Sequence, residues 1–268
     1  MSDPTAADLD RPAPEQVVQF FLTPRLPPPA PEFLPHPTAL SIDTPSGSIA
    51  LRRSGHGPRV LLLHGWEGQA ADLAAFAPPL LDAGFEVITM DLPAHGASSG
   101  RQTSIPQSAR ALKAVGDVLG PLHAVIAHSV GSAVLGEALH HGLDAGHAVM
   151  IGAPAHYAAY ARQVAAFAGL DEEGTQRMLE LLREPLGVNI HEVSLPARAV
   201  HFTLPALFIH SSDDRIVAIA DSLASAAAWR GARHLRVEGL GHRRILGDAN
   251  VIAAALKFIT AVLEEPAS

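Results

Sequence analysis

From residue 39 onward, short uninterrupted apolar runs alternate with segments that have helical spacing. Such runs are typical of strands buried on both faces, as in a parallel sheet covered by helices. The pattern predicts an α/β fold with a mostly parallel, twisted sheet flanked by helices on both faces. We expect an antiparallel hairpin over 39–43 and 48–53, then strands over 59–63, 86–90, 123–127, 148–151, 206–209 and 234–237. We expect helices over 70–83, 105–119, 130–142, 219–229 and 249–263.

The first 38 residues form a Pro-rich extension ahead of the α/β domain, which we expect over 39–268. Ten of the 22 prolines lie between Pro4 and Pro37. Proline fixes φ and removes a donor, so this stretch is neither a central strand nor a long helix. Its one apolar patch, residues 17–22, either forms a helical turn or two that dock on the domain or belongs to a disordered leader.

Residues 152–205 interrupt the alternation, because they hold three helical stretches, over 156–169, 172–184 and 190–201, and no strand. An insertion with its own helices predicts a lid, over about 154–203, above the sheet edge where open α/β sheets bind ligands. The run Asp171-Glu172-Glu173 is typical of a helix start. Most of the large apolar residues of the insertion are expected to pack within the lid. They are Tyr157, Tyr160, Phe167, Leu170, Met178, Leu181 and Leu182.

Composition excludes several classes of function. Nineteen Lys plus Arg against 27 Asp plus Glu give a net charge of −8, which argues against nucleic acid as a partner. The absence of cysteine excludes disulfides, thiolate metal sites and a cysteine nucleophile. No apolar run approaches the roughly 18 residues of a membrane span, and the acidic start is unlike a signal peptide. We therefore expect a cytoplasmic protein.

Histidine and arginine clusters offer two weaker functional signals. His140 and His141 lie close in sequence to His147, but adjacent helical residues point about 100° apart and chelate one ion poorly. We expect no metal and no other cofactor. Arg243 and Arg244 either recognise an anionic substrate or pair with acids such as Asp248.

The strongest signal for chemistry is Ala127-His128-Ser129-Val130-Gly131, between an expected strand and an expected helix. A serine on a tight strand-to-helix turn projects its hydroxyl from the sheet edge, and small residues two positions before and after it allow close backbone approach. The pattern indicates a nucleophile elbow. The alternative is a serine that only caps the helix.

A serine nucleophile needs a general base and a group that orients the base. Gly239-Leu240-Gly241-His242 follows the last expected strand and supplies an imidazole at the same edge. The segment 210–217 follows the preceding strand and supplies a carboxylate. We favour Asp214 over Asp213, because Asp213 lies closer to the strand end, where it could instead cap or pair with Arg215.

Acyl transfer also needs donors for the carbonyl oxygen, which becomes negative as the reaction proceeds. In Leu63-His64-Gly65-Trp66, after the first parallel strand, the Trp66 N–H is a candidate. The Val130 N–H, just after Ser129, is the second. We expect His64 to hold the loop and the Trp66 indole to wall the pocket, with Tyr157 and Tyr160 as further candidate pocket residues.

These motifs together, with Asp91-Leu92-Pro93-Ala94-His95-Gly96-Ala97-Ser98, resemble those of the α/β-hydrolase superfamily over residues 39–265. The sequence departs from the family pattern at Ala127 and Ala94, where glycine is usual. The resemblance implies a nucleophile at Ser129, a base at His242, an orienting acid at Asp214 and no cofactor.

The expected function is a serine hydrolase that cleaves a carboxylic ester or related acyl compound through an acyl-enzyme at Ser129. Its partner would be a small-molecule acyl substrate with an apolar acyl group. An acyltransferase with the same site, or a non-catalytic ligand sensor on the same fold, are the alternatives. No residue pattern indicates the oligomeric state.

Overall fold

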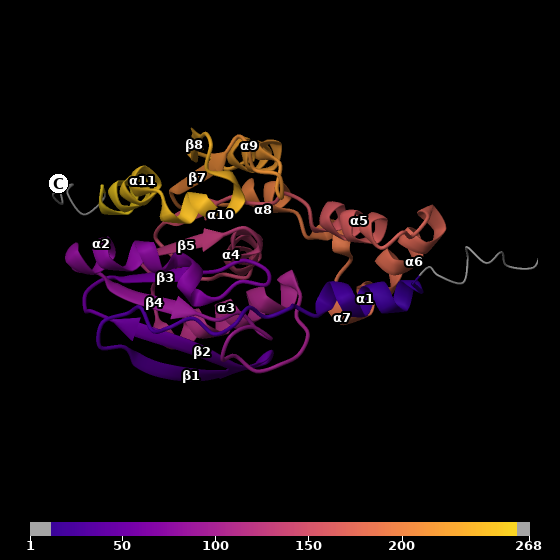
Figure 1. The fold of residues 1–268 in the computed structure, drawn as a ribbon. Coiled ribbons are helices and arrows are strands. Elements are labelled where there is room, and N and C mark those ends of the chain that lie inside the picture. The colour runs from indigo at the N-terminus through magenta and orange to yellow at the C-terminus, as the bar shows by residue number, and fades with distance from the viewer. Residues whose placement is uncertain (1–11, 262–268) are drawn as a thin grey trace, which may run out of the picture.

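The computed structural model describes residues 12–261, so the acidic start, the first part of the extension and the last residues of the helix expected over 249–263 lie outside the described residues. One eight-stranded sheet runs through the domain in the order β1-β2-β4-β3-β5-β6-β7-β8 (Figure 1). The strands are β1 Thr38–Thr44, β2 Gly47–Ser54, β3 Arg59–Leu63, β4 Glu86–Met90, β5 Ala124–His128, β6 Ala148–Ile151, β7 Ala206–Ser211 and β8 Arg233–Val237.

The sheet is parallel from β4 to β8, and the β1–β2 hairpin joins β4 antiparallel. The predicted mostly parallel α/β sheet and its hairpin are therefore confirmed. The strands β3, β5, β6, β7 and β8 are successive neighbours in the sheet and are parallel. The loops that follow them therefore all leave from the same edge of the sheet. Every sequence motif with candidate chemistry follows one of the sheet strands.

Helices cover both faces of the sheet, as expected. Alternate residues of β3 enter different cores: Leu61 and Leu63 pack toward α3, α4 and α9, whereas Val60 and Leu62 pack toward α2 and α11. These helices are α2 Ala77–Asp82, α3 Ile105–Leu119, α4 Val130–His140, α9 Ile219–Ala228 and α11 Ala249–Thr260, and a short α10, Gly241–Arg244, continues into a 3₁₀ turn at Ile245–Gly247.

The helix expected over 70–83 is in fact two elements, a 3₁₀ helix at Ala70–Phe76 followed by α2. Pro78 and Pro79 lie in the first turn of α2. Neither can donate the backbone hydrogen bond that would continue an α-helix from the preceding turn, so the α-helix begins anew there.

The insertion between β6 and β7 contains α5 Tyr157–Phe167, α6 Glu172–Leu181, α7 Arg183–Leu186, a 3₁₀ turn at Ile190–Glu192 and α8 Leu195–Ala199. A bridge between His156 and Ser194 joins its two ends. The stretch expected over 172–184 divides at Leu182, and the stretch over 190–201 divides before α8.

Two expectations for the insertion have different outcomes. Asp171 caps α6 by accepting from the Gly174 N–H at 2.8 Å, which confirms the predicted helix start. Phe167 is an exception among the apolar residues of which most were expected to pack within the insertion, since it is 88% exposed at the end of α5. Helical spacing placed it on the apolar side, but α5 ends there and nothing in the described chain covers it.

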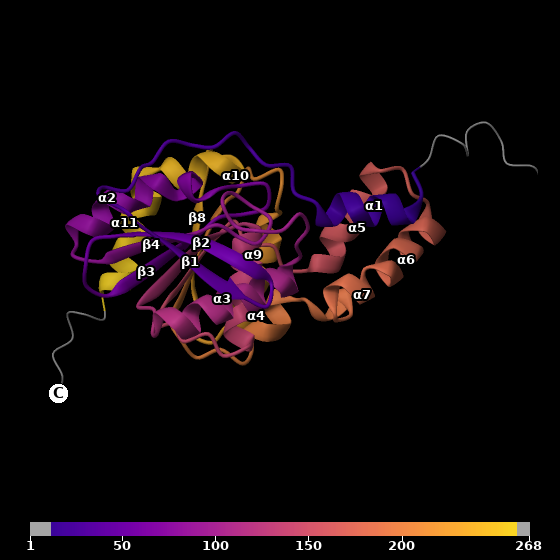
Figure 2. The same ribbon diagram turned by 90° about the horizontal axis from the view of Figure 1, so that it is seen from below.

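The apolar patch over 17–22 belongs to helix α1, Pro14–Leu22, which lies beside α5 and α6 rather than on the sheet (Figures 1 and 2). Its Phe21 ring is 5.2 Å from the Tyr157 ring and 5.7 Å from the Tyr160 ring, between centroids. The chain then crosses to the domain, where the Arg25 guanidinium pairs with Glu67 at 3.1 Å. The extension thus links the insertion to the sheet.

Among residues 12–261, no helix has both the length and the apolar character required to traverse a bilayer.

Replacing Phe21 with alanine tests the docking of α1. Phe21 is 3% exposed, so we expect Phe21→Ala to lower the free energy of unfolding by about 3 kcal/mol, as for other buried aromatic truncations. The neighbouring Phe20 is 46% exposed, and Phe20→Ala should cost less than about 0.5 kcal/mol. Urea titrations of the three proteins measure both values, and equal losses would contradict the docked arrangement.

Candidate active site

Ser129 occupies the turn between β5 and α4 in a conformation that side chains rarely adopt, with φ 53° and ψ −125°. Such backbone costs on the order of 1–3 kcal/mol and persists only where the surroundings enforce it. The Ser129 N–H donates to the Ile151 carbonyl at 2.8 Å and ties the turn to β6. Its side chain makes no helix-capping hydrogen bond, unlike Ser104 at the start of α3, so capping does not account for this serine.

The Ser129 hydroxyl lies 2.9 Å from Nε2 of His242, at the start of α10 just after β8. Nδ1 of the same ring lies 2.6 Å from Oδ2 of Asp214, in the loop after β7. With a proton on Nδ1, the imidazole donates to the carboxylate and its Nε2 accepts from the hydroxyl. Three side chains separated by up to 113 residues therefore form one chain of hydrogen bonds.

The two acids of the β7 loop have different contacts. The side chain of Asp214 is 2% exposed, and its carboxylate also accepts from the Ile216 and Val217 N–H groups at 2.8 and 3.0 Å. Asp213 accepts from the Ser211 hydroxyl and from the Gly241 N–H. The structure places Asp214 against the imidazole, while Asp213 holds the loop that carries His242.

The Asp214 carboxyl is held ionised. Burial raises its pKa, but hydrogen bonds from His210, His242 and the two loop N–H groups outweigh this effect and bring the pKa well below the usual range. The negative charge of the carboxylate stabilises the imidazolium that forms when His242 takes up a proton.

The turn after β3 lies directly against Ser129. A Cβ added to Gly65 would lie 3.0 Å from the Ser129 Cβ and 3.2 Å from the His128 carbonyl, so a side chain at this position would force one of these groups to shift. The Trp66 N–H has no partner in the described part of the chain. The Val130 N–H opens α4, where first-turn N–H groups have no intrahelical acceptor. Both residues line the same cavity as Ser129.

Two buried histidines fix this turn. Nδ1 of His64 donates to the Gly65 carbonyl at 2.7 Å, and its Nε2 accepts from the Leu92 N–H at 3.1 Å. Nδ1 of His95 donates to the Pro93 carbonyl, and its Nε2 accepts from the Glu67 N–H at 3.1 Å. Each ring needs one bare nitrogen for these bonds. Burial lowers the pKa of His64, and it lowers the pKa of His95 to about 4, so both stay neutral at pH 7.

His64 holds the loop, as expected from the sequence, whereas the part played by His95 was not anticipated. His95 belongs to the motif over 91–98, whose loop contains Ala94 at φ 61°. Alanine at this position, where the related pattern has glycine, therefore adopts the left-handed backbone that glycine adopts more readily.

Two further histidines support the hydrogen-bonded chain and were also missed. His128 Nε2 donates to the His242 carbonyl at 2.9 Å, and the two rings lie 4.7 Å apart. His210, fully buried at the end of β7, has its Nε2 3.3 Å from Oδ2 of Asp214 and 3.0 Å from the Val217 carbonyl. Both histidines lie inside motifs recognised in the sequence, 127–131 and 210–217, which could have indicated a role for them. The spacing of a motif does not show what an imidazole ring contacts, however.

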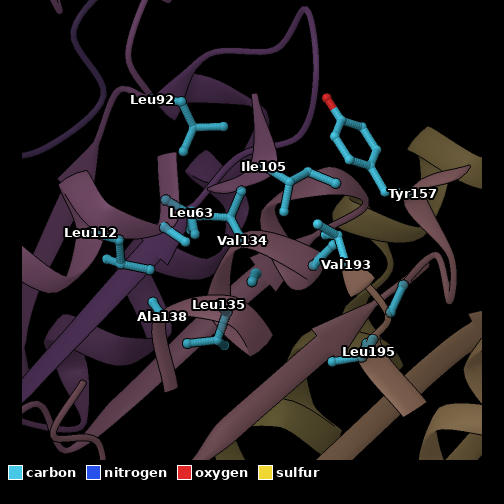
Figure 3. Packing of buried hydrophobic residues seen from close by; sticks show 14 of the residues in the cluster. Leu63, Leu92, Ile105, Leu112, Val134, Leu135, Ala138, Tyr157, Val193 and Leu195 are labelled. Carbon is cyan, nitrogen blue, oxygen red and sulfur yellow. The ribbon is translucent and has the colours of Figure 1, made fainter. Parts of the chain in front are cut away.

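The hydroxyl of Ser129 opens into a cavity of about 200 Å³. Trp66, Tyr157 and Tyr160 line it, as proposed from the sequence. Ile105, Tyr157, Val193 and Leu195 belong both to its wall and to the core cluster drawn in Figure 3. The full lining is Trp66, Glu67, Ile105, Ser129, Val130, Ala133, Glu137, Pro154, Ala155, His156, Tyr157, Tyr160, Val193, Leu195, Ile216, Val217, His242 and Arg243.

The arginine and histidine clusters noted in the sequence lie in different surroundings. Arg243 lines the cavity, and Arg244 donates to the Gly239 carbonyl at 3.0 Å. Asp248 caps α11 and does not pair with either arginine. The His140 and His141 rings lie 5.4 Å apart on the surface side of α4. Within residues 12–261, no three His, Cys, Asp or Glu side chains are arranged to hold a metal ion.

Comparison with known proteins agrees with this architecture. The chain is 31% identical over 252 residues to a pimeloyl-[acyl-carrier protein] methyl ester esterase of Stenotrophomonas maltophilia (strain R551-3), an alignment that covers 78% of this chain and 95% of the relative. The corresponding esterase of Xanthomonas campestris pv. campestris (strain B100) is 30% identical over 249 residues, covering 78% and 97%.

Solved structures share the fold at lower identity. A thermophilic esterase from Thermogutta terrifontis superposes with a TM-score of 0.65 at 18% identity, covering 84% of this chain and 99% of that one. A membrane phospholipase A superposes with a TM-score of 0.66 at 16% identity, covering 85% and 87%. The family model described as the alpha/beta hydrolase family matches residues 60–255. The chain belongs to the alpha/beta hydrolase family.

Proposed function

We propose that this ester-hydrolysing member of the family is a serine esterase that cleaves carboxylic esters through an acyl-enzyme at Ser129. The observation that carries the proposal is the continuous hydrogen-bonded chain from the Ser129 hydroxyl through His242 to the ionised Asp214. The relatives named as methyl ester esterases support an ester as the bond that is cleaved.

In the proposed reaction, the Ser129 oxygen attacks the ester carbonyl carbon while Nε2 of His242 takes the hydroxyl proton. The carbonyl oxygen becomes negative and accepts from the N–H groups of Trp66 and Val130, which stabilises it by several kcal/mol in a site shielded from water. The alcohol leaves with the proton from His242. Water then attacks the acyl-enzyme, with His242 again as the base, and Ser129 is regenerated.

Asp214 orients the imidazole so that Nε2 faces the hydroxyl, and it stabilises the charged ring during both steps. His210 supports Asp214, and His128 supports the backbone of His242. We regard these two as positioning residues, because neither reaches the reacting atoms.

Two cavities adjoin the proposed reacting atoms and suggest how an ester is divided between them. The larger is walled mainly by apolar side chains of α4 and of the insertion, which suits an acyl chain. A smaller cavity of about 110 Å³ includes Gly65, Asp72 and Leu246, which suits a short alcohol. In this proposal the insertion over about 154–203 acts as a lid above the acyl chain.

The cytoplasmic location inferred from the sequence stays a prediction.

Exchanging each acid of the β7 loop for its amide tests the proposal. Asp214→Asn should lower kcat/KM for p-nitrophenyl esters roughly 10⁴-fold, because the amide no longer holds the required tautomer or stabilises the imidazolium. Asp213→Asn, the matched control, should change kcat/KM less than tenfold. Steady-state rates near pH 7.5, with circular dichroism to verify folding, measure both. Equal losses, or a larger loss at residue 213, would reject the assigned roles.

A second prediction concerns the buried His128. Burial and the neighbouring His242 lower its pKa to about 3, against about 6.5 in an unfolded chain. Between these values the unfolded chain binds a proton that the folded protein does not. The contribution of this ring to the free energy of unfolding is therefore complete above pH 6.5. Below that pH it is lost by about 1.4 kcal/mol per pH unit.

His128→Gln removes this proton while keeping a donor for the His242 carbonyl. We expect the slope of unfolding free energy against pH, measured by urea titration between pH 6 and 4.5, to decrease by about 1.4 kcal/mol per pH unit. The exposed Asn250, whose side chain does not titrate, provides the control, and Asn250→Gln should leave the slope unchanged. An unchanged slope in His128→Gln would show that the ring is not buried and neutral.

A further inference from the structure

One carboxylate in the wall of the larger cavity, away from the proposed reacting atoms, is held in an ion pair by an arginine behind the wall. Glu137 lines the cavity from α4, and its side chain is 6% exposed. Arg198, on α8 of the insertion, donates from Nε at 3.0 Å and from Nη2 at 3.4 Å to the two carboxylate oxygens. Together they form a two-point ion pair that no step of the proposed reaction uses.

The pair stands at a defined distance from Ser129. Val130, Ala133 and Glu137 are spaced so that they share one face of α4, and all three line the cavity. Glu137 is eight positions beyond Ser129 in the sequence, which places it on the order of 12 Å further along the helix axis. The cavity therefore follows α4 from the hydroxyl of Ser129 toward the carboxylate.

Other charged groups in the cavity wall belong to its opposite end. Glu67 and Arg243 adjoin Trp66 and His242 in the sequence, next to the proposed reacting atoms. The wall between these residues and Glu137 is mainly apolar, with Ala133 on α4 and Leu195 on α8. Leu195 packs against the backbone of α4, since a Cβ added to Gly136 would meet its Cδ1. The Glu137 carboxylate thus lies at the end of a mainly apolar passage.

Packing alone does not explain this pair. The ion pair contributes little net stability compared with apolar side chains of the same volume, because the buried Glu137 carboxylate loses its hydration while the Arg198 side chain stays 23% exposed. Each carboxylate oxygen of Glu137 accepts one hydrogen bond from Arg198, so further lone pairs are available to a donor in the cavity. Glu137 can therefore accept a hydrogen bond from a small polar group bound there.

We propose that Glu137, held by Arg198, recognises a hydroxyl group at the far end of the acyl chain, so that hydroxyacyl esters are preferred over plain alkyl esters. This inference rests on the proposed esterase function. A hydroxyl donates to the carboxylate, whereas a methyl group displaces water from it without replacing the hydrogen bond. A terminal carboxylate meets repulsion from Glu137, and the charge of Arg198 already balances the attraction of Glu137 for a terminal ammonium.

The spacing along α4 sets the length of the chain. Side chains of a helix lean toward its N-terminus, so the Glu137 carboxylate reaches back toward Ser129 and shortens the passage below the axial distance. Since an extended chain advances roughly 1.2 Å per bond, we expect the hydroxyl on an acyl chain of about six to eight carbons.

The test compares matched esters of equal heavy-atom number, p-nitrophenyl 8-hydroxyoctanoate against nonanoate and 6-hydroxyhexanoate against heptanoate. In the wild type, kcat/KM should favour at least one hydroxy ester by roughly ten- to hundredfold. The double variant Glu137→Leu/Arg198→Leu, which removes both charges together, should lose this preference or reverse it. Glu137→Gln, which keeps the side-chain shape, should reduce it and serves if the double variant does not fold.

The control is an exposed ion pair within the insertion, Arg162 with Glu172 at 3.3 Å, which does not line the cavity. Arg162→Leu/Glu172→Leu should leave the hydroxyl preference unchanged. A wild-type ratio near one for both pairs of esters, or a ratio that survives Glu137→Gln and the double variant, overturns the inference. If plain esters are still hydrolysed in a Ser129-dependent manner, only the inference fails. If no ester is hydrolysed, the proposed function fails.

Discussion

The candidate site depends on the parallel arrangement of neighbouring strands. β5, β6, β7 and β8 are adjacent in the sheet and run in one direction, so the turns that follow them lie side by side at one edge. Ser129, Asp214 and His242 each lie in one of these turns. No local interaction could bring together residues so far apart in the chain. The hydrophobic packing that buries both faces of the sheet therefore also assembles the hydrogen-bonded chain.

Neutral, buried histidines give this edge its rigidity. His64 and His95 hold the turn that contains Trp66, and His128 holds the backbone of His242. A neutral imidazole can donate on one side and accept on the other, so it can link two backbone segments without introducing a charge. The strained turn at Ser129 persists because its surroundings are fixed in this way.

Much of the fold was predictable because each element carries a local signal. Buried strands appear as apolar runs, and the motif around Ser129 requires a strand-to-helix turn. The supporting contacts were not predictable, because His210 and His95 differ from the other histidines only in what surrounds them after folding. Docking of α1 could not be decided either, since its apolar patch finds its partners, Tyr157 and Tyr160, well over a hundred residues away. The pairing of Glu137 with Arg198 is equally non-local.

In the proposed reaction the Ser129 oxygen is a nucleophile activated by His242. Its reactivity can be measured by incubation with a fluorophosphonate, followed by intact-protein and peptide mass spectrometry. We expect one phosphonyl group per chain, attached at Ser129, absent from Ser129→Ala and formed far more slowly in His242→Ala. An unlabelled folded wild-type protein, or a label on a different residue, would contradict it.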